Sequence, residues 1–124
     1  MKNYSLLCDF YELTMSNGYL KNGYSEKTTY FDMFFRKVPD EGGFAIFAGL
    51  EQLCDYIKNL RFSDEDIDFL RKKGIFDEKF LKYLADFKFT GDIYAVPEGT
   101  PIFPYEPVIT VKAKAIEAQL IETF

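Results

Sequence analysis

The residue types that most often carry out catalysis are either missing from this chain or poorly spaced for it. The 124 residues contain no histidine, which excludes Ser/His/Asp and Cys/His arrangements and removes the commonest metal ligand. Cys8 and Cys54 lack the spacing of a zinc site or of a disulfide framework, so both are expected to be buried thiols in a reducing compartment. The pair Gly42 and Gly43 matches neither phosphate-binding fingerprint. The sequence therefore predicts no self-contained active site, and any catalysis would be shared with other polypeptide.

The composition is that of a globular protein that binds neither nucleic acid nor membrane. Phe occurs 14 times and Tyr 9 times, and this aromatic content of 19% is too high for a disordered segment. The net charge is −5, and the one basic cluster is Arg71 to Lys73, which excludes an extended nucleic-acid surface. The apolar run from Phe44 to Leu50 is far shorter than the roughly 18 residues of a membrane span. A cytoplasmic domain is therefore expected.

The first predicted helix runs from Phe10 to Lys21 and carries Tyr11 in its first turn. Asp9 followed by Glu12 resembles a capping box, and Gly23 is expected to stop the helix. On a helical wheel, Tyr11 shares one side with Met15 and Tyr19, whereas Leu13 and Leu20 lie on the opposite flank. The pattern predicts two packing partners, and without further information Tyr11 would be interpreted as a core aromatic.

Four further helices are predicted from apolar spacing and from capping residues. Ser63 with Asp66 forms a capping box, and Asp77 is expected to cap the helix that follows Gly74. The predicted helices cover residues 49–59, 64–73, 78–86 and 115–124.

The remaining segments are predicted to be strands and turns. Thr28 to Lys37 is rich in aromatic and β-branched residues at period two and is predicted to be a central strand, and Val38 to Phe44 should form a loop. Prolines interrupt the segments that follow Phe89, so these are predicted to be edge strands or turns. The predicted class is α+β, with a mixed or antiparallel sheet and flanking helices.

The last predicted helix carries an apolar stripe of Ile116, Leu120 and Phe124 and shows no capping residue at its end. We therefore expect residues 1–124 to be an amino-terminal module cut within a helix of a longer protein. Exposed apolar side chains at such a cut should promote self-association, so an oligomer is expected.

Four blocks of the sequence resemble the amino-terminal portion of bacterial nicotinate phosphoribosyltransferase. They are LLCDFYELTMSNGYLKNG, TTYFDMFFRKVPDEGGFAIFAGLEQLCDYI, FLKYLADFKFTGDIYAVPEGTPIFPYEPVITVKA and IEAQLIETF, and they keep their order and spacing along nearly all of the chain. The resemblance implies the amino-terminal α/β module of a type II phosphoribosyltransferase, without the α/β barrel that carries the catalytic histidine. It also implies a head-to-tail dimer with active sites at the subunit interface.

The implied reaction joins nicotinate to phosphoribosyl pyrophosphate, forming nicotinate mononucleotide and pyrophosphate with ATP hydrolysis, in the salvage of NAD. ATP and Mg²⁺ would serve the full-length enzyme, and none is expected to bind this chain, which should be inactive alone. Two alternatives stay open at this point: a freestanding interaction module, and a relative acting on nicotinamide or quinolinate.

The resemblance also implies two substrate-binding residues and no catalytic or metal-binding residue within this chain. Tyr11, in the DFYELTM block, would reach into the neighbouring subunit and stack on the pyridine ring. Arg36, in the FFRK block, would bind phosphate oxygens of phosphoribosyl pyrophosphate; the alternative is an ion pair with Asp32 on the same strand face. Asp9 is expected to act chiefly as a helix cap.

Overall fold

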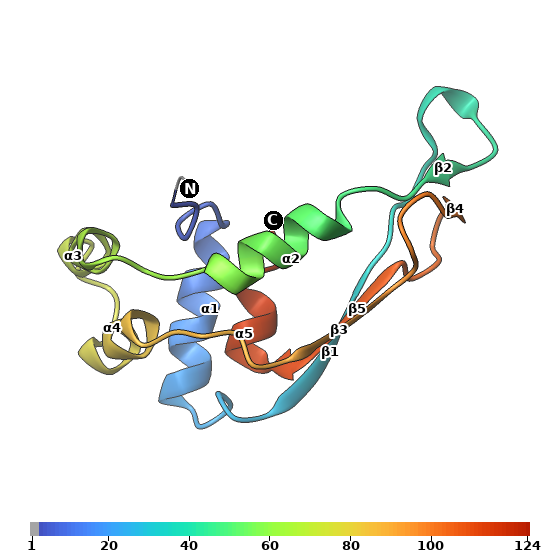
Figure 1. The fold of residues 1–124 in the computed structure, drawn as a ribbon. Coiled ribbons are helices and arrows are strands. Elements are labelled where there is room, and N and C mark those ends of the chain that lie inside the picture. The colour runs from blue at the N-terminus through green and yellow to red at the C-terminus, as the bar shows by residue number, and fades with distance from the viewer. Residues whose placement is uncertain (1–2) are drawn as a thin grey trace.

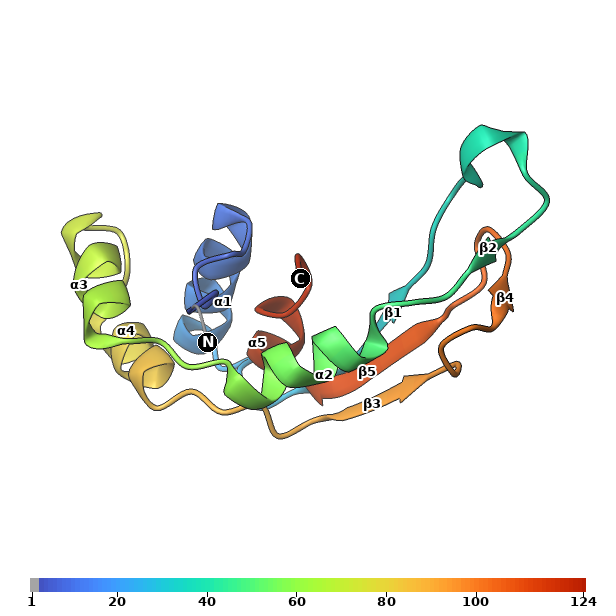
Figure 2. The ribbon, with the colours of Figure 1, turned by 45° about the horizontal axis from the view of Figure 1, so that its top comes forward.

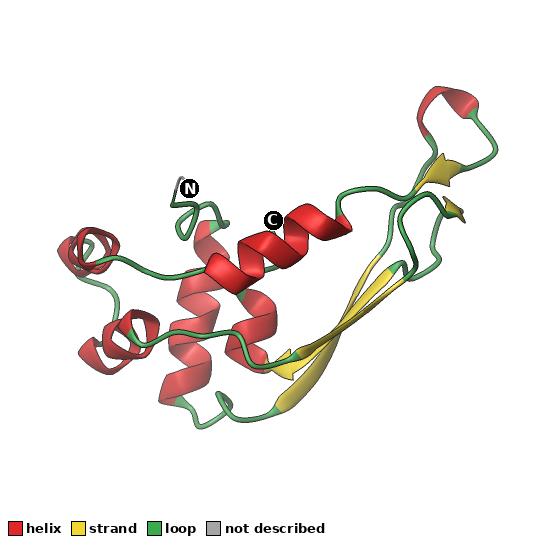
Figure 3. Ribbon diagram, viewed as in Figure 1, coloured by secondary structure: helices red, strands yellow, loops and turns green. Residues whose placement is uncertain are grey.

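The computed structural model describes residues 3–124, in which helices gather at one end of an extended antiparallel sheet (Figure 1). The helices are α1 (Phe10–Lys21), α2 (Leu50–Asn59), α3 (Asp64–Lys72), α4 (Glu78–Ala85) and α5 (Ala115–Gln119), with the 3-10 helix η1 at Pro39–Glu41. The strands are β1 (Thr28–Met33), β2 (Ala45–Ile46), β3 (Asp92–Ala95), β4 (Pro101–Ile102) and β5 (Ile109–Lys114). The second view and the colouring by element type show α1, α3 and α4 at the end away from the β2–β4 tip, with α2 running from that end toward the sheet (Figures 2 and 3). The predicted α+β class with an antiparallel sheet is confirmed.

The three-stranded sheet has the order β1-β5-β3, so β5 and not β1 is the central strand. Phe31 of β1 and Ile93 of β3 both pair with Val111 of β5, one from each side. The predicted central position of Thr28 to Lys37 is therefore wrong, as is the edge position predicted for β5. Prolines precede β5, but none lies within Ile109–Lys114, so every one of its N–H groups can join a ladder. A separate ladder of β2 with β4 forms the far tip of the molecule (Figure 1).

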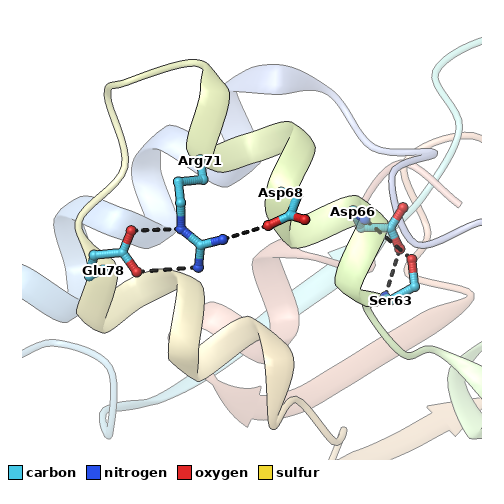
Figure 4. Close-up of polar contacts among 5 residues, drawn as sticks. All are labelled: Ser63, Asp66, Asp68, Arg71 and Glu78. Atoms are coloured by element: carbon cyan, nitrogen blue, oxygen red, sulfur yellow. Dashed lines mark hydrogen bonds and ion pairs between the residues drawn. The ribbon is translucent and has the colours of Figure 1, made fainter.

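The start of α3 is stabilised by the capping box that the sequence predicts. The Ser63 hydroxyl accepts from the Asp66 N–H at 3.2 Å, and the Asp66 carboxylate accepts from the Ser63 N–H at 2.8 Å. Arg71, at the end of the same helix, donates to Glu78 at 2.8 Å and to Asp68 at 2.6 Å (Figure 4). The predicted bounds of α1 through α4 agree with the structure to within one residue at each end.

Two predicted caps and one predicted helix end are wrong. Neither Asp9 nor Asp77 caps its helix with its side chain; the Asp77 N–H instead donates to Asn17 on α1 at 3.1 Å. Helix α5 covers Ala115–Gln119 and does not continue to Phe124. The residues after it turn back onto α1 and α2, where they make tertiary contacts that outweigh their helical spacing.

The core lies among the helices and against one side of β5. Its most deeply buried side chains come from four helices and the turn after α5, and they are Phe80, Leu70, Leu81, Leu84, Ile116, Leu120, Glu12 and Ser16. Alternate residues of β5 are also buried, as the period of a strand requires. Among the helices formed by residues 3–124, none has the length and apolar character needed to cross a membrane.

Candidate functional site

Tyr11 lies in the first turn of α1 with 44% of its surface exposed, so it is not a core aromatic. Its hydroxyl donates to Oε1 of Glu122 at 2.6 Å. Donation to this carboxylate raises the pKa of Tyr11 to about 12, so the phenol stays a neutral donor at physiological pH. Its neighbour Phe10 meets Phe76 edge to face, but the ring of Tyr11 pairs with no other aromatic ring among residues 3–124. The hydroxyl is therefore held while the ring is partly open to solvent.

The three residues Glu122 to Phe124 connect the end of α5 to the start of α1. The Thr123 hydroxyl accepts from the Asp9 N–H at 3.1 Å and donates to the Glu12 carboxylate. The ring of Phe124 stacks on Tyr56 of α2, with 3.9 Å between centroids and 5° between planes. These contacts hold residues 122–124 in place, and so they hold Glu122 beside Tyr11.

Glu12, the next residue after Tyr11 in the first turn of α1, is fully buried. One of its oxygens accepts from Thr123, whereas Oε2 has no partner in the described part of the chain. The hydroxyls of Ser16, one turn later, and of Tyr56 are likewise buried without partners there. Burial raises the pKa of Glu12, while the hydrogen bond from Thr123 partly opposes this. The predicted capping box of Asp9 and Glu12 is therefore not formed, because the Asp9 side chain makes no cap hydrogen bond.

Glu12→Gln is expected to stabilise the chain increasingly as the pH rises. Because the folded-state pKa of Glu12 lies above its unfolded-state value, the protonated form favours folding. That contribution is complete below the unfolded-state pKa and is lost as the pH rises through the folded-state pKa. The amide stays neutral, so in urea unfolding the stability gap between variant and wild type should widen as the pH rises above the ordinary carboxyl pKa of 4.5. A gap independent of pH would contradict this, and Glu65→Gln, at an exposed residue of α3, is the control.

Arg36 follows β1 and does not form the ion pair with Asp32 that was the alternative. Asp32 instead accepts from the Thr110 hydroxyl at 2.6 Å, and within residues 3–124 Arg36 has no acidic partner within 4.0 Å. Its guanidinium lies 5.9 Å from the centroid of the Phe34 ring, which in turn lies 6.0 Å from that of Tyr105. The cation therefore rests beside an aromatic pair, with its hydrogen-bonding capacity available.

The fold does not bring Tyr11 and Arg36 together within one chain. Tyr11 belongs to α1 in the helical end, whereas the segment that carries Arg36 leaves β1 toward the tip formed by β2 and β4 (Figures 1 and 2). Two clefts found among the described residues are lined by neither Tyr11 nor Arg36. One is lined by Lys79, Lys82 and other residues near α4. The other lies between the segment Asn3 to Ser5 and residues of the stretch from Tyr56 to Ser63.

The model of the nicotinate phosphoribosyltransferase (NAPRTase) N-terminal domain matches residues 6–124. This chain belongs to that family. A Mycobacterium tuberculosis protein named nicotinate phosphoribosyltransferase pncB2 is 43% identical over 120 residues, which are 97% of this chain and 26% of that protein. The Bacillus subtilis nicotinate phosphoribosyltransferase is 42% identical over 96% of this chain and 24% of its own length.

The fold agrees with a solved structure of the family. The crystal structure of human nicotinic acid phosphoribosyltransferase superposes with a TM-score of 0.85 and 32% identity, over 93% of this chain and 24% of the human chain. The chain thus spans about a quarter of the length of the relatives it matches, and it has the fold of the amino-terminal domain without a closed barrel.

In this member of the nicotinate phosphoribosyltransferase family, sequence reasoning missed Glu122 and Thr123, and it interpreted Glu98 as a residue that fixes a turn. Glu98 accepts from the N–H groups of Gly49 and Glu51 at 2.8 and 3.2 Å and so caps α2 from a distant loop. These two donors lower the pKa of its carboxyl. The local sign in the sequence was a glycine at the N-cap of α2, because glycine has no side-chain oxygen to cap the helix. In the structure Gly49 has a left-handed backbone. No local pattern pointed to Glu122 or Thr123, because their partners lie more than 100 residues earlier in the chain.

Proposed function

We propose that this chain is the amino-terminal part of an enzyme that transfers a phosphoribosyl group to nicotinate. Phosphoribosyl pyrophosphate would lose pyrophosphate as its ribose carbon bonds to the ring nitrogen, giving nicotinate mononucleotide for NAD salvage, with ATP hydrolysis coupled to the transfer. The observation that carries the proposal is the family match over residues 6–124, joined to relatives about four times as long that bear this name. The two free and partly buried cysteines support a reducing, cytoplasmic setting.

Tyr11 is proposed to stack on the pyridine ring of nicotinate. Its ring is exposed and unpaired, and its hydroxyl is already engaged, so the ring faces are what it can offer to a ligand. Offset stacking between aromatic rings contributes about 0.5–1.5 kcal/mol beyond the burial of area. That is enough to influence the KM for a small aromatic substrate.

Arg36 is proposed to bind phosphate oxygens of phosphoribosyl pyrophosphate. A guanidinium without a carboxylate partner can donate two parallel hydrogen bonds to a phosphate, and that of Arg36 lies 5.9 Å from the centroid of the Phe34 ring. Since Tyr11 and Arg36 lie in separate parts of one chain, a site containing both requires a second copy. This supports a head-to-tail dimer in which neighbouring subunits each supply one residue.

Exposed apolar side chains along the sheet support the same assembly. Within the described residues they gather on β1, β2, β4 and the adjoining loops, and they include Met33, Phe34, Phe44, Ile46, Phe103 and Tyr105. Single exposed apolar residues are common on protein surfaces, whereas a group of neighbouring ones is typical of contact with further polypeptide. We propose that it contacts the remaining part of the enzyme or the neighbouring subunit.

The described part of the chain forms no metal cage of its own, whereas Mg²⁺ is commonly bound by one or two carboxylates together with substrate phosphates. Among residues 3–124, no three or more Asp, Glu, Cys or His side chains converge closely enough to hold a metal ion. The sequence likewise contains no glycine-rich phosphate loop. We propose that ATP and Mg²⁺ bind in the part of the enzyme beyond this chain, and we derive no step through them.

The test compares the 124-residue chain with the whole protein encoded by its reading frame. With nicotinate, phosphoribosyl pyrophosphate, ATP and Mg²⁺, only the whole protein should form nicotinate mononucleotide, as followed by chromatography, and nicotinamide or quinolinate should not replace nicotinate. Product from the chain alone would contradict the proposal that further polypeptide is needed. A reading frame that ends at Phe124 would favour the interaction module instead.

Tyr11→Ala in the whole protein is expected to raise the KM for nicotinate about tenfold or more, because it removes both the stack and the buried area of the ring. Tyr24→Ala is a matched control, since Tyr24 is similarly exposed but lies in the turn after α1, beside Lys27. Steady-state kinetics with varied nicotinate measures both. An unchanged KM in Tyr11→Ala would remove Tyr11 from the site.

A further inference from the structure

We propose that Glu122 is a positioning residue that fixes the orientation of the Tyr11 ring for the aromatic substrate. The inference rests on the proposed role of Tyr11 and extends it to a residue that does not itself touch the ligand. What carries it is the contact between the Tyr11 hydroxyl and Glu122 Oε1, which at 2.6 Å is a short, charge-assisted hydrogen bond.

Glu122 is itself held from behind. Its second oxygen, Oε2, accepts from the amide nitrogen of Gln119 at 2.6 Å. Gln119 is almost completely buried, and its carbonyl oxygen accepts from the Tyr19 hydroxyl at 3.3 Å. A connected set of hydrogen bonds therefore begins in the interior and ends at the exposed Tyr11. Glu122 is oriented by the core even though its own side chain faces solvent.

The backbone around Glu122 is fixed as well. Thr123, the next residue, bridges the Asp9 N–H and the buried Glu12 carboxylate, and Phe124 stacks on Tyr56. Asp9 and Glu12 flank Tyr11 in the first turn of α1. The first turn of α1, which carries Tyr11, is thus joined to residues 122–124, which carry its acceptor, through Asp9 and through Glu12.

This arrangement gives Tyr11 a preorganised ring. A tyrosine that is free at both of its side-chain torsions loses rotamer entropy when a ligand orders it, and a hydroxyl fixed beforehand reduces that loss. The ring face remains unpaired and partly exposed, which suits a flat aromatic ligand. Removing Glu122 should therefore weaken the binding of the aromatic substrate and leave the chemical step largely unaffected.

The first experiment tests the contact without any ligand. Tyrosine labelled with ¹³C at Cζ is titrated by NMR in the whole protein, and the Tyr11 signal is identified by its loss in Tyr11→Phe. Glu122→Gln removes the charged acceptor, so the pKa of Tyr11 should fall from about 12 toward the ordinary value of 10.0. An unchanged pKa would overturn the inference, because Glu122 would then not be the acceptor.

The second experiment measures nicotinate kinetics. Tyr11→Phe and Glu122→Ala should each raise the KM for nicotinate by about three- to tenfold with a kcat changed less than about twofold, and the double variant should add nothing further. Glu122→Gln keeps an acceptor oxygen, so its KM for nicotinate should be close to that of wild type and not to that of Glu122→Ala. Glu65→Ala, at an exposed carboxylate far from Tyr11 in sequence, is the control.

The outcomes separate this inference from the proposed function. If Tyr11→Ala raises the KM but Tyr11→Phe and Glu122→Ala do not, the ring binds substrate without positioning, and the role of Glu122 is overturned. If even Tyr11→Ala leaves the KM unchanged, the ring-binding role fails and takes this inference with it. Additive effects of Tyr11→Phe and Glu122→Ala would also overturn it, since the two residues would then act independently.

Discussion

Phe80→Ala is expected to lower the free energy of unfolding by about 3–5 kcal/mol, the typical cost of truncating a fully buried phenylalanine. Phe80 lies in α4 with no exposed surface, and its ring lies 5.8 Å from that of Phe76. The truncation removes apolar area from the centre of the helical end and leaves a cavity that neighbouring helices can close only in part. Because small domains are stable by only about 5–15 kcal/mol in total, the variant should lose a large fraction of its stability.

Urea unfolding followed by circular dichroism measures this loss. The matched control is Phe69→Ala, at a phenylalanine on α3 that is half exposed and lies beside Lys73. This control should shift stability by less than about 1 kcal/mol, because little buried area is lost. Equal losses in the two variants would show that the helical end is not centred on α4.

Gly91→Ala is expected to be the most damaging small substitution, costing about 1–3 kcal/mol or more through overpacking. A Cβ at this position would lie 2.5 Å from Cβ of Ala113 and 2.6 Å from the carbonyl oxygen of Lys112. Both contacts are with the central strand β5, whose backbone is paired on both sides and cannot move away. Pairing of β3 with β5 should therefore be strained at its first residue.

Gly18→Ala provides a control of opposite sign. Gly18 lies inside α1, and a Cβ added there would meet nothing within 4 Å, so alanine should stabilise the chain by about 0.5–1 kcal/mol through helix propensity. Thermal unfolding of the two variants should therefore shift in opposite directions. A melting temperature of Gly91→Ala equal to that of wild type would contradict the close approach of β3 to β5.

Much of the helical part of the fold could be predicted from the sequence, because the signals involved are local. The capping box of Ser63 and Asp66 and the apolar spacing of α2, α3 and α4 depend on residues within one or two turns of each other. Such patterns specify an element before any tertiary contact forms. The same applies to the α+β class, which follows from the order of helical and strand-like segments.

The errors arose where a distant partner decided the outcome. Glu12 has the spacing of a capping residue, but its carboxylate is buried and accepts a hydrogen bond from the hydroxyl of Thr123. Residues 120–124 have helical spacing, but α5 ends at Gln119 and the ring of Phe124 stacks on Tyr56. The aromatic richness of β1 suggested a central strand, whereas pairing on both sides makes β5 central.

The sequence by itself determined that no histidine is present for catalysis, and its resemblance to the family supplied the two candidates, an aromatic in the first turn of α1 and an arginine after β1. Only the tertiary structure decided that Tyr11 is exposed and held by Glu122, that Arg36 is free of Asp32, and that the two lie in different parts of the chain. The physical reason is that residue type and periodicity act over a few neighbours. Exposure and the hydrogen bond to Glu122, by contrast, depend on contacts between segments more than 100 residues apart.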